Sequence, residues 1–319
     1  MPQGDDRSRE ADRSAPNDIS GDVPLTPAQR FQWYVSNIAL YNAEEVPLDR
    51  VWNFHCDLAP YPGPFCKARQ TPSRVLSNLF WLNLPSAAIR EELGPIKLLD
   101  IGCGSGRYFT VLDGKLDGVQ AYIGIDVQRN PLIDQLERDP RARFVLSPAE
   151  EVDVGILRES NLLYSQSAME HVPLDLLTFR RVAEVAKAKT TPTLQLHLLP
   201  SALMFRQYGP HGYRGYNSQA LKAIAELFSD FSEVTIYTLG GSRSIEVHCD
   251  YIFDCFDTAK GDRRKTWRSG YVDAVQAALR ADMAEASIPV NGACALALVI
   301  HSHPKASIFG PKTFVQANL

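Results

Sequence analysis

The segment that most constrains the fold is a short apolar run that ends in an acid and enters a turn with glycine at every second position. It reads Leu98-Leu99-Asp100-Ile101-Gly102-Cys103-Gly104-Ser105-Gly106-Arg107. An apolar run closed by such a turn predicts a buried strand that leads into a helix, here from Ser105 to Leu112. Glycine adopts backbone angles closed to other residues and lets a ligand approach the main chain. The helix start points free N–H groups into the same space, so the segment predicts a ligand-binding turn.

The spacing of the glycines argues against a dinucleotide site. The dinucleotide fingerprint needs its third glycine, or an alanine, at the position that Arg107 occupies in this chain. A pyrophosphate cradle is therefore not expected here, and the ligand must be of another kind.

Three further segments follow the glycine turn in a fixed order. A second apolar strand, 121–125, ends in Asp126, and a carboxylate at that position can accept both hydroxyls of a ribose. A third strand, 143–147, leads into the acidic turn Pro148-Ala149-Glu150-Glu151. A fourth strand ends at Ser165 and Gln166 and is followed by Glu170-His171-Val172.

The four segments resemble the four motifs of the S-adenosylmethionine-dependent methyltransferases with a Rossmann-like fold. The resemblance implies S-adenosylmethionine as cofactor and a cofactor site at the ends of these strands. Its residues would be Asp100, Gly102, Cys103, Gly104, Gly106, Asp126, Val127, Ala149, Glu150, Ser165 and Gln166. Pro148 departs from the pattern, because the family commonly has Asp there, so the adenine amino group would depend on the backbone at Ala149.

The resemblance also implies the architecture. We expect an α/β fold with a seven-stranded, mostly parallel sheet and helices on both faces. Strand five is expected at 193–199, a helix at 218–228, strand six at 231–239, and strand seven, antiparallel to the rest, at 293–301.

Composition divides the chain into regions around this domain. Residues 1–22 are polar and should be disordered. Residues 23–95 predict a helical cap, 96–302 the cofactor-binding domain, and 303–319 a C-terminal tail. Within the domain we expect a lid at 201–217 and an insertion at 241–290 with a long helix near 271–286. The insertion would shape either the substrate pocket or a homodimer interface.

Two helices are expected in the cap. One starts at Thr26-Pro27 and places Phe31, Tyr34, Val35 and Ile38 on one face. The other starts at Pro72 and bears Val75, Leu76, Leu79 and Phe80.

Charge and apolar patterning exclude several function classes. The net charge of −4 argues against a nucleic-acid footprint. The longest apolar run, 293–300, is far too short to span a membrane, and the polar N-terminus lacks a secretory signal. Six cysteines without C-x-x-C spacing indicate reduced thiols, so we expect a cytoplasmic protein.

Two histidines are candidate bases, because both are expected beyond or late in a strand near the methyl group. They are His171, which in relatives can merely orient a helix, and His197, which could equally be a core residue. His211, Tyr213 and Arg214, in the loop 209–217, are candidate substrate contacts. A basic cluster in the insertion is either a solvated helix start or a clamp for an anionic acceptor: Lys260, Arg263, Arg264, Lys265 and Arg268.

The sequence predicts no metal. In the ubiquinone-biosynthesis O-methyltransferases, Glu-x-x-Glu-His holds a divalent ion; here Glu170 and His171 match, but Ser167 replaces the first Glu. Losing one carboxylate of three leaves a poor site for a hard cation.

These observations together predict an enzyme that methylates a small molecule, on a hydroxyl of a sugar, lipid or secondary metabolite. N-methylation of a small amine and a non-catalytic partner subunit with the same fold remain the alternatives. The intact glycine turn and Asp126 argue against the latter.

Overall fold

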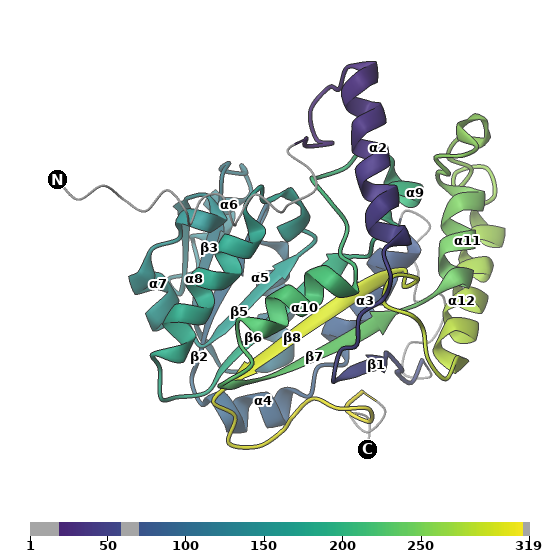
Figure 1. Ribbon diagram of the computed structural model, residues 1–319. Coiled ribbons are helices and arrows are strands. Elements are labelled where there is room, and N and C mark those ends of the chain that lie inside the picture. The colour runs from purple at the N-terminus through teal and green to yellow at the C-terminus, as the bar shows by residue number, and fades with distance from the viewer. Residues whose placement is uncertain (1–18, 59–69, 315–319) are drawn as a thin grey trace.

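The protein is described here by a computed structural model that covers residues 19–58 and 70–314 (Figure 1). Its described residues build one mixed eight-stranded sheet with helices on both faces. The sequence predictions for residues 1–18 and for 315–319 of the C-terminal tail lie outside the described residues.

The strands follow the order β1-β7-β8-β6-β5-β2-β3-β4 across the sheet. Their bounds are β1 Val51–Asn53, β2 Ile96–Ile101, β3 Val119–Asp126, β4 Ala142–Leu146, β5 Leu162–Gln166, β6 Thr193–Pro200, β7 Ser232–Leu239 and β8 Ala295–Ser302. Only β8 runs antiparallel to its neighbours, β6 and β7, as expected for the last strand. The prediction of a Rossmann-like α/β sheet is confirmed.

The predicted number of strands is wrong: the part of the chain that the structure describes has eight, not seven. The additional strand, β1, lies within the region expected to be a helical cap. It pairs parallel to β7, with Val51 opposite Ile236. An uncovered β7 would present unpaired backbone groups at the sheet edge, so a short covering strand satisfies them.

Helices cover the two faces in separate groups. The bounds are α2 Pro27–Asn42, α3 Pro72–Leu82, α4 Ser86–Leu93, α5 Arg107–Leu116, α6 Ile133–Leu136, α7 Val154–Glu159, α8 Asp175–Lys187, α9 Met204–Tyr208, α10 Ser218–Glu226, α11 Ser242–Tyr251 and α12 Arg268–Ala284. Three short 3₁₀ turns are η2 Ala149–Glu151, η3 Met169–His171 and η4 Thr258–Lys260. Apolar residues of α3, α5, α11 and α12 share one buried cluster, and those of α7, α8 and α10 share another.

The second cap helix confirms its prediction. Thr71 caps α3 with its side chain, and Pro72 occupies the first turn. Val75, Leu76, Leu79 and Phe80 are all buried. This helix packs against α5, α11, α12 and the sheet, so it fixes the wall of the site described below.

The predicted face of α2 is only half right: Tyr34 and Ile38 pack against the core, but Phe31 and Val35 do not, although the helix begins at Thr26-Pro27 as expected. Phe31 is 70% exposed and Val35 49% exposed, whereas Trp33 and Asn37 are the buried residues. Polar contacts orient the helix: the Trp33 indole N–H donates to the Gly212 carbonyl at 3.0 Å, and the Asn37 side chain accepts from the backbone of Gly215. The spacing of apolar residues in the sequence does not reveal hydrogen bonds of this kind.

The end of the segment predicted to be disordered, 1–22, has a defined position. The backbone N–H of Gly21 donates to the Gly212 carbonyl at 2.6 Å, and that of Gly212 donates to Asp22 Oδ1 at 2.9 Å. The prediction is wrong for residues 19–22, because contacts with a distant loop replace the local apolar residues that the composition lacks.

The insertion after β7 forms α11 and α12, which pack against each other and against α3. The long helix predicted near 271–286 is α12. Among the described residues, no helix combines the length and apolar character needed to cross a bilayer.

Candidate active site

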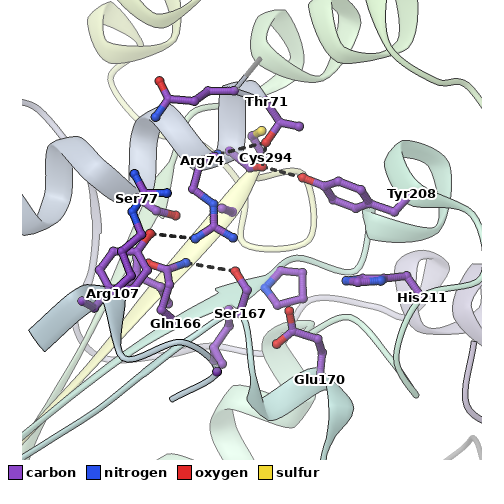
Figure 2. Close-up of a pocket in the computed structure, with 18 of the residues that line it drawn as sticks. Thr71, Arg74, Ser77, Arg107, Gln166, Ser167, Glu170, Tyr208, His211 and Cys294 are labelled. Atoms are coloured by element: carbon purple, nitrogen blue, oxygen red, sulfur yellow. Dashed lines mark hydrogen bonds between the residues drawn. The ribbon is translucent and has the colours of Figure 1, made fainter. Parts of the chain in front are cut away.

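The carboxyl ends of β2, β3, β5 and β6 meet at one edge of the sheet, because these strands run parallel. A cavity of about 1820 Å³ opens at this edge. Drug-sized ligands fill pockets of roughly 300–1,000 Å³, so the space suffices for two small substrates. Figure 2 shows side chains from α3, from the β5 end and from the loop after α9 converging on it.

The glycine turn forms part of this cavity as the sequence indicated. Gly102, Gly104 and Gly106 all have positive φ, of 69°, 53° and 69°. A Cβ on Gly102 would lie 2.5 Å from the Cβ of Ala168, whereas a Cβ on Gly104 would meet no atom within 4 Å. Gly102 is therefore required by packing, and Gly104 leaves open space directly above the backbone at the cavity.

Asp126 lies at the end of β3 next to this turn. Its Oδ2 accepts the backbone N–H of Gly104 at 2.8 Å, and its Oδ1 accepts that of Gln128 at 3.1 Å. The carboxylate is thus hydrogen-bonded to Gly104, which lines the cavity. An acid at the end of a strand accepts ribose hydroxyls from this position.

The other predicted cofactor residues divide into two groups. Asp100, Gly102, Cys103, Gly104 and Gln166 line the cavity. The remainder lie outside its lining: Gly106, Asp126, Val127, Ala149, Glu150 and Ser165. Val127 is 63% exposed, and Ser165 is fully buried.

Asp100 is a buried carboxyl that two phenols hold in place. The hydroxyls of Tyr122 and Tyr164 donate to its Oδ2 at 2.9 and 2.8 Å. Burial raises the pKa of Asp100 to about 7, and these two hydrogen bonds oppose the rise. Near neutral pH the group is therefore only partly ionised.

Gln166 is oriented from the opposite wall. The indole N–H of Trp81, on α3, donates to its Oε1 at 2.7 Å, and its amide donates to Ser167 Oγ at 2.9 Å. The side chain at the end of β5 is therefore held from two sides, by Trp81 of the cap and by Ser167; Figure 2 shows the contact with Ser167.

Glu170 is a functional candidate that the sequence treated only as part of a broken metal motif. Its residue is 1% exposed, it lines the cavity, and Oε2 has no hydrogen-bond partner among the described residues. Burial raises the pKa of the Glu170 carboxyl to about 7, against the charges of His171 and Arg74.

The two predicted bases lie outside the cavity lining. His197 is 1% exposed, its Nδ1 hydrogen-bonds Ser165 Oγ at 2.9 Å, and burial lowers its pKa to about 3. His171 Nδ1 hydrogen-bonds Asp22 Oδ2 at 2.7 Å. Burial opposes the charged form of His171, but Asp22 and Glu170 outweigh it and raise the pKa.

The loop 209–217 contributes His211 to the cavity lining, but not the other two substrate candidates, and a substrate contact of His211 stays a prediction. Tyr213 donates its backbone N–H to the Glu170 carbonyl at 2.7 Å. Arg214 forms an ion pair with the buried carboxylate of Asp175, which also accepts the hydroxyl of Tyr216 at 2.6 Å. Charge compensation in the core thus takes Arg214 away from the cavity.

One wall of the cavity is cationic. It includes Arg74, Arg107, Arg264, Lys265 and Arg268. Arg264 is paired with Asp262, but Arg107, Lys265 and Arg268 make no ion pair with any described residue. The basic cluster noted in the sequence supplies three of the five. Arg263 instead lies over the rings of Tyr251 and Trp267, and nothing is described of the Lys260 side chain.

Comparison with known proteins gives fold-level likeness alone. No family model matches the chain, and no curated protein matches it. Among solved structures it resembles a 1,6-didemethyltoxoflavin-N1-methyltransferase from Burkholderia thailandensis with S-adenosylhomocysteine bound, at 14% identity, TM-score 0.40, over 68% of this chain and 76% of the other.

Two further solved structures have similar scores. A plantazolicin methyltransferase in complex with S-adenosylhomocysteine aligns at 13% identity and TM-score 0.41, over 73% of this chain and 86% of its own. A putative sarcosine dimethylglycine methyltransferase from Galdieria sulphuraria aligns at 14% and 0.43, over 72% and 86%. Scores at this level transfer no substrate or reaction to this chain.

Proposed function

We propose that this protein transfers a methyl group from S-adenosylmethionine to a hydroxyl of a small, anionic molecule. The observation that carries the proposal is the turn at the end of β2. Its three glycines have positive φ, the space above Gly104 is open, and Asp126 reaches the turn from the neighbouring strand. The turn can receive the methionine part of the cofactor while Asp126 accepts the ribose hydroxyls.

The cationic wall supports an anionic acceptor. S-adenosylmethionine has one carboxylate, which a single cation can bind. Arg268 lies at the start of α12 and Lys265 just before it, and neither forms an ion pair with a described residue, although the charge of Asp262 acts on Lys265. Cations gathered in a cavity repel one another unless an anion joins them, so a carboxylate or phosphate on the acceptor complements this wall.

Glu170 supports a hydroxyl as the acceptor. Methyl transfer to oxygen requires that a proton leave the hydroxyl, and a base placed beside it contributes roughly 10²–10⁴-fold. Glu170 lines the cavity and its buried Oε2 has no hydrogen-bond partner among the described residues, whereas His171 and His197 do not belong to the lining. We therefore assign the proton-accepting role to Glu170. Alignment of the hydroxyl behind the sulfur–methyl bond is the larger contribution, up to roughly 7–11 kcal/mol.

The proposal is tested by calorimetric titration of the full chain with S-adenosylhomocysteine, followed by methyl-transfer assays. The acceptors are matched sets: a hydroxy acid, its neutral amide, and the corresponding amino acid analogue. We expect micromolar cofactor-product binding and transfer to the hydroxy acid. Absence of binding would overturn the proposal. Binding without transfer to any set would favour the non-catalytic subunit, and preference for the amine would favour N-methylation.

A further inference from the structure

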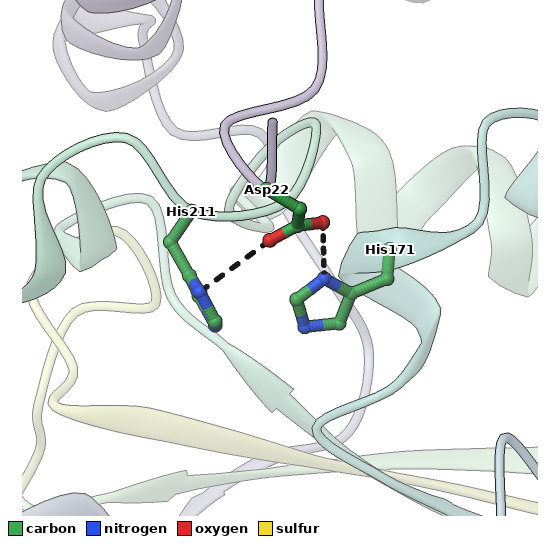
Figure 3. A group of neighbouring side chains, drawn as sticks. All are labelled: Asp22, His171 and His211. Carbon is green, nitrogen blue, oxygen red and sulfur yellow. Dashed lines mark hydrogen bonds and ion pairs between the residues drawn. The ribbon is translucent and has the colours of Figure 1, made fainter. Parts of the chain in front are cut away.

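Three side chains that are distant in sequence converge beside the cavity, and one of them, His211, lines it. They are Asp22, from the segment before α2; His171, at the end of η3; and His211, from the loop after α9 (Figure 3). Asp22 Oδ2 lies 2.7 Å from His171 Nδ1, and Asp22 Oδ1 lies 3.7 Å from His211 Nδ1. One ligating atom from each residue falls within 4.8 Å of the other two.

We propose that Asp22, His171 and His211 bind a divalent first-row transition-metal ion of the Zn²⁺ type. Imidazole nitrogen and carboxylate oxygen are the donors that such ions prefer, at about 2.0–2.2 Å. Two ligands of one ion then lie roughly 3–4 Å apart. The Asp22–His211 distance already falls in this range, and the Asp22–His171 contact has to open slightly to reach it.

Glu170 provides an independent observation for the same site. Its buried Oε1 lies 3.9 Å from His171 Nε2, and its Oε2 has no partner among the described residues. An ion on His171 Nδ1 places the ring proton on Nε2, where it faces the Glu170 carboxylate. A carboxylate behind a ligating histidine is the usual support of such a site, because it fixes the tautomer and the ring orientation.

The surroundings allow an ion to enter and to remain. The side chains of His171, Asp22 and His211 are 33%, 36% and 40% exposed, so the site is open to solvent. The two imidazole rings meet edge to face, 4.6 Å between centroids, and cannot both be protonated without repulsion. The backbone N–H of Gly212 continues to hold Asp22 Oδ1 when the ion replaces the proton between Asp22 and His171.

Such an ion would join the N-terminal segment, through Asp22, to the loop 209–217, through His211. His211 also lines the cavity. Three protein ligands leave a coordination position for water or for an acceptor oxygen. The set differs from the Glu-x-x-Glu-His motif, because two of its members lie outside that stretch. The inference does not depend on the proposed methyl transfer, and either can fail alone.

The test uses full-length protein treated with a chelator, which is then passed into metal-free buffer at pH 7.5. Zn²⁺ is titrated calorimetrically, and Co²⁺ is followed by its visible absorption. We expect one site per chain with micromolar or tighter affinity and a higher Tm with Zn²⁺. Asp22→Asn and His211→Gln should each weaken binding at least a hundredfold. His303→Gln, a histidine distant from the cluster, should bind as the parent does.

Three results would overturn the proposal. They are millimolar or absent binding to the parent, unchanged affinity in both Asp22→Asn and His211→Gln, and Co²⁺ bands typical of thiolate ligands, which would indicate cysteines. Melting of each variant without metal shows whether it is folded. Because S-adenosylhomocysteine binding is measured on the same samples, loss of the cofactor site is distinguished from loss of the metal site.

Discussion

The two sides of the cavity are built in different ways. The side assigned to the cofactor consists of one turn, Gly102 to Gly106, and the ends of adjacent strands. The opposite side is assembled from α3, the loop after α9 and the part of the insertion around the start of α12, which come together only in the folded chain. Figure 1 shows these latter segments approaching the sheet edge from separate parts of the sequence.

This difference determines what each side tolerates. On the cofactor side the backbone itself forms the surface, so a single substitution acts directly on the ligand. On the acceptor side, many contacts hold the segments in place before any side chain reaches a substrate. Substitutions there should more often alter stability than chemistry, except at the unpaired cations.

The largest effect is expected on the cofactor side, at Gly104→Val. The turn requires φ of 53°, which a β-branched residue resists, and the side chain would fill the open space above the turn. Calorimetry should show S-adenosylhomocysteine affinity reduced about a thousandfold, equivalent to about 4 kcal/mol.

Gly114→Val is the matched control for that variant. Gly114 lies in α5, has no positive φ, and also has open space at its Cβ position. It should bind the cofactor product normally. If folded Gly104→Val bound S-adenosylhomocysteine with normal affinity, the turn would not be part of the cofactor site. The contrast between the two sides of the cavity would then be lost as well.

On the acceptor side, Arg214→Ala should act on stability. The change leaves the carboxylate of Asp175 buried without its cation, and breaking a buried pair costs about 3–5 kcal/mol. Denaturant unfolding should show that loss, whereas Arg243→Ala, which breaks an exposed pair with Glu246, should change stability by less than about 1 kcal/mol. An Arg214→Ala protein of full stability with impaired acceptor turnover would instead restore Arg214 as a substrate contact.

The sequence analysis succeeded where neighbours in the chain are also neighbours in space. The strand, the glycine turn and Asp126 follow each other with a spacing that sheet geometry imposes. Five of the predicted cofactor residues line the cavity and six do not, and their role in binding stays a prediction. The antiparallel last strand followed from the same pattern.

The sequence analysis failed where the interacting residues are distant in the sequence. The approach of Asp22 to His171 depends on the backbone pairing between Gly21 and Gly212, for which no local pattern exists. No local pattern predicts the ion pair of Arg214 with Asp175 or the pairing of β1 with β7 either. The orientation of α2 is set by the buried indole of Trp33 and its hydrogen bond, and not by the predicted apolar face alone.

His197 gives a smaller effect that separates a core histidine from a catalytic one. Burial lowers its pKa to about 3, below the ordinary 6.5, so the unfolded chain binds a proton first as the pH falls. The stability due to the neutral ring is complete above pH 6.5 and is lost below it, by about 2 kcal/mol at pH 5.

His197→Asn keeps a side chain that can bond Ser165 and cannot titrate. Between pH 8 and pH 5, the parent should therefore lose about 2 kcal/mol more stability than this variant, as measured by urea unfolding at each pH. Parallel pH profiles combined with abolished turnover would return His197 to the catalytic group.

The smallest effect is expected at the cationic wall, for Arg268→Gln. Arg268 lines the cavity near the start of α12 and makes no ion pair with a described residue, so its removal disturbs no internal partner. One charge-assisted hydrogen bond to an anionic acceptor is worth about 1.5–3 kcal/mol, and at this exposed position we expect the lower end, about a tenfold fall in kcat/KM. Cofactor affinity should stay the same, as should turnover of the neutral amide of the acceptor. Arg280→Gln, an exposed position on the same helix outside the lining, serves as the control for charge alone. Equal losses for the anionic acceptor and its amide would mean that Arg268 shapes the wall without recognising charge. The acceptor side would then select its substrate by shape and not by charge. The glycine turn on the cofactor side likewise acts through its shape.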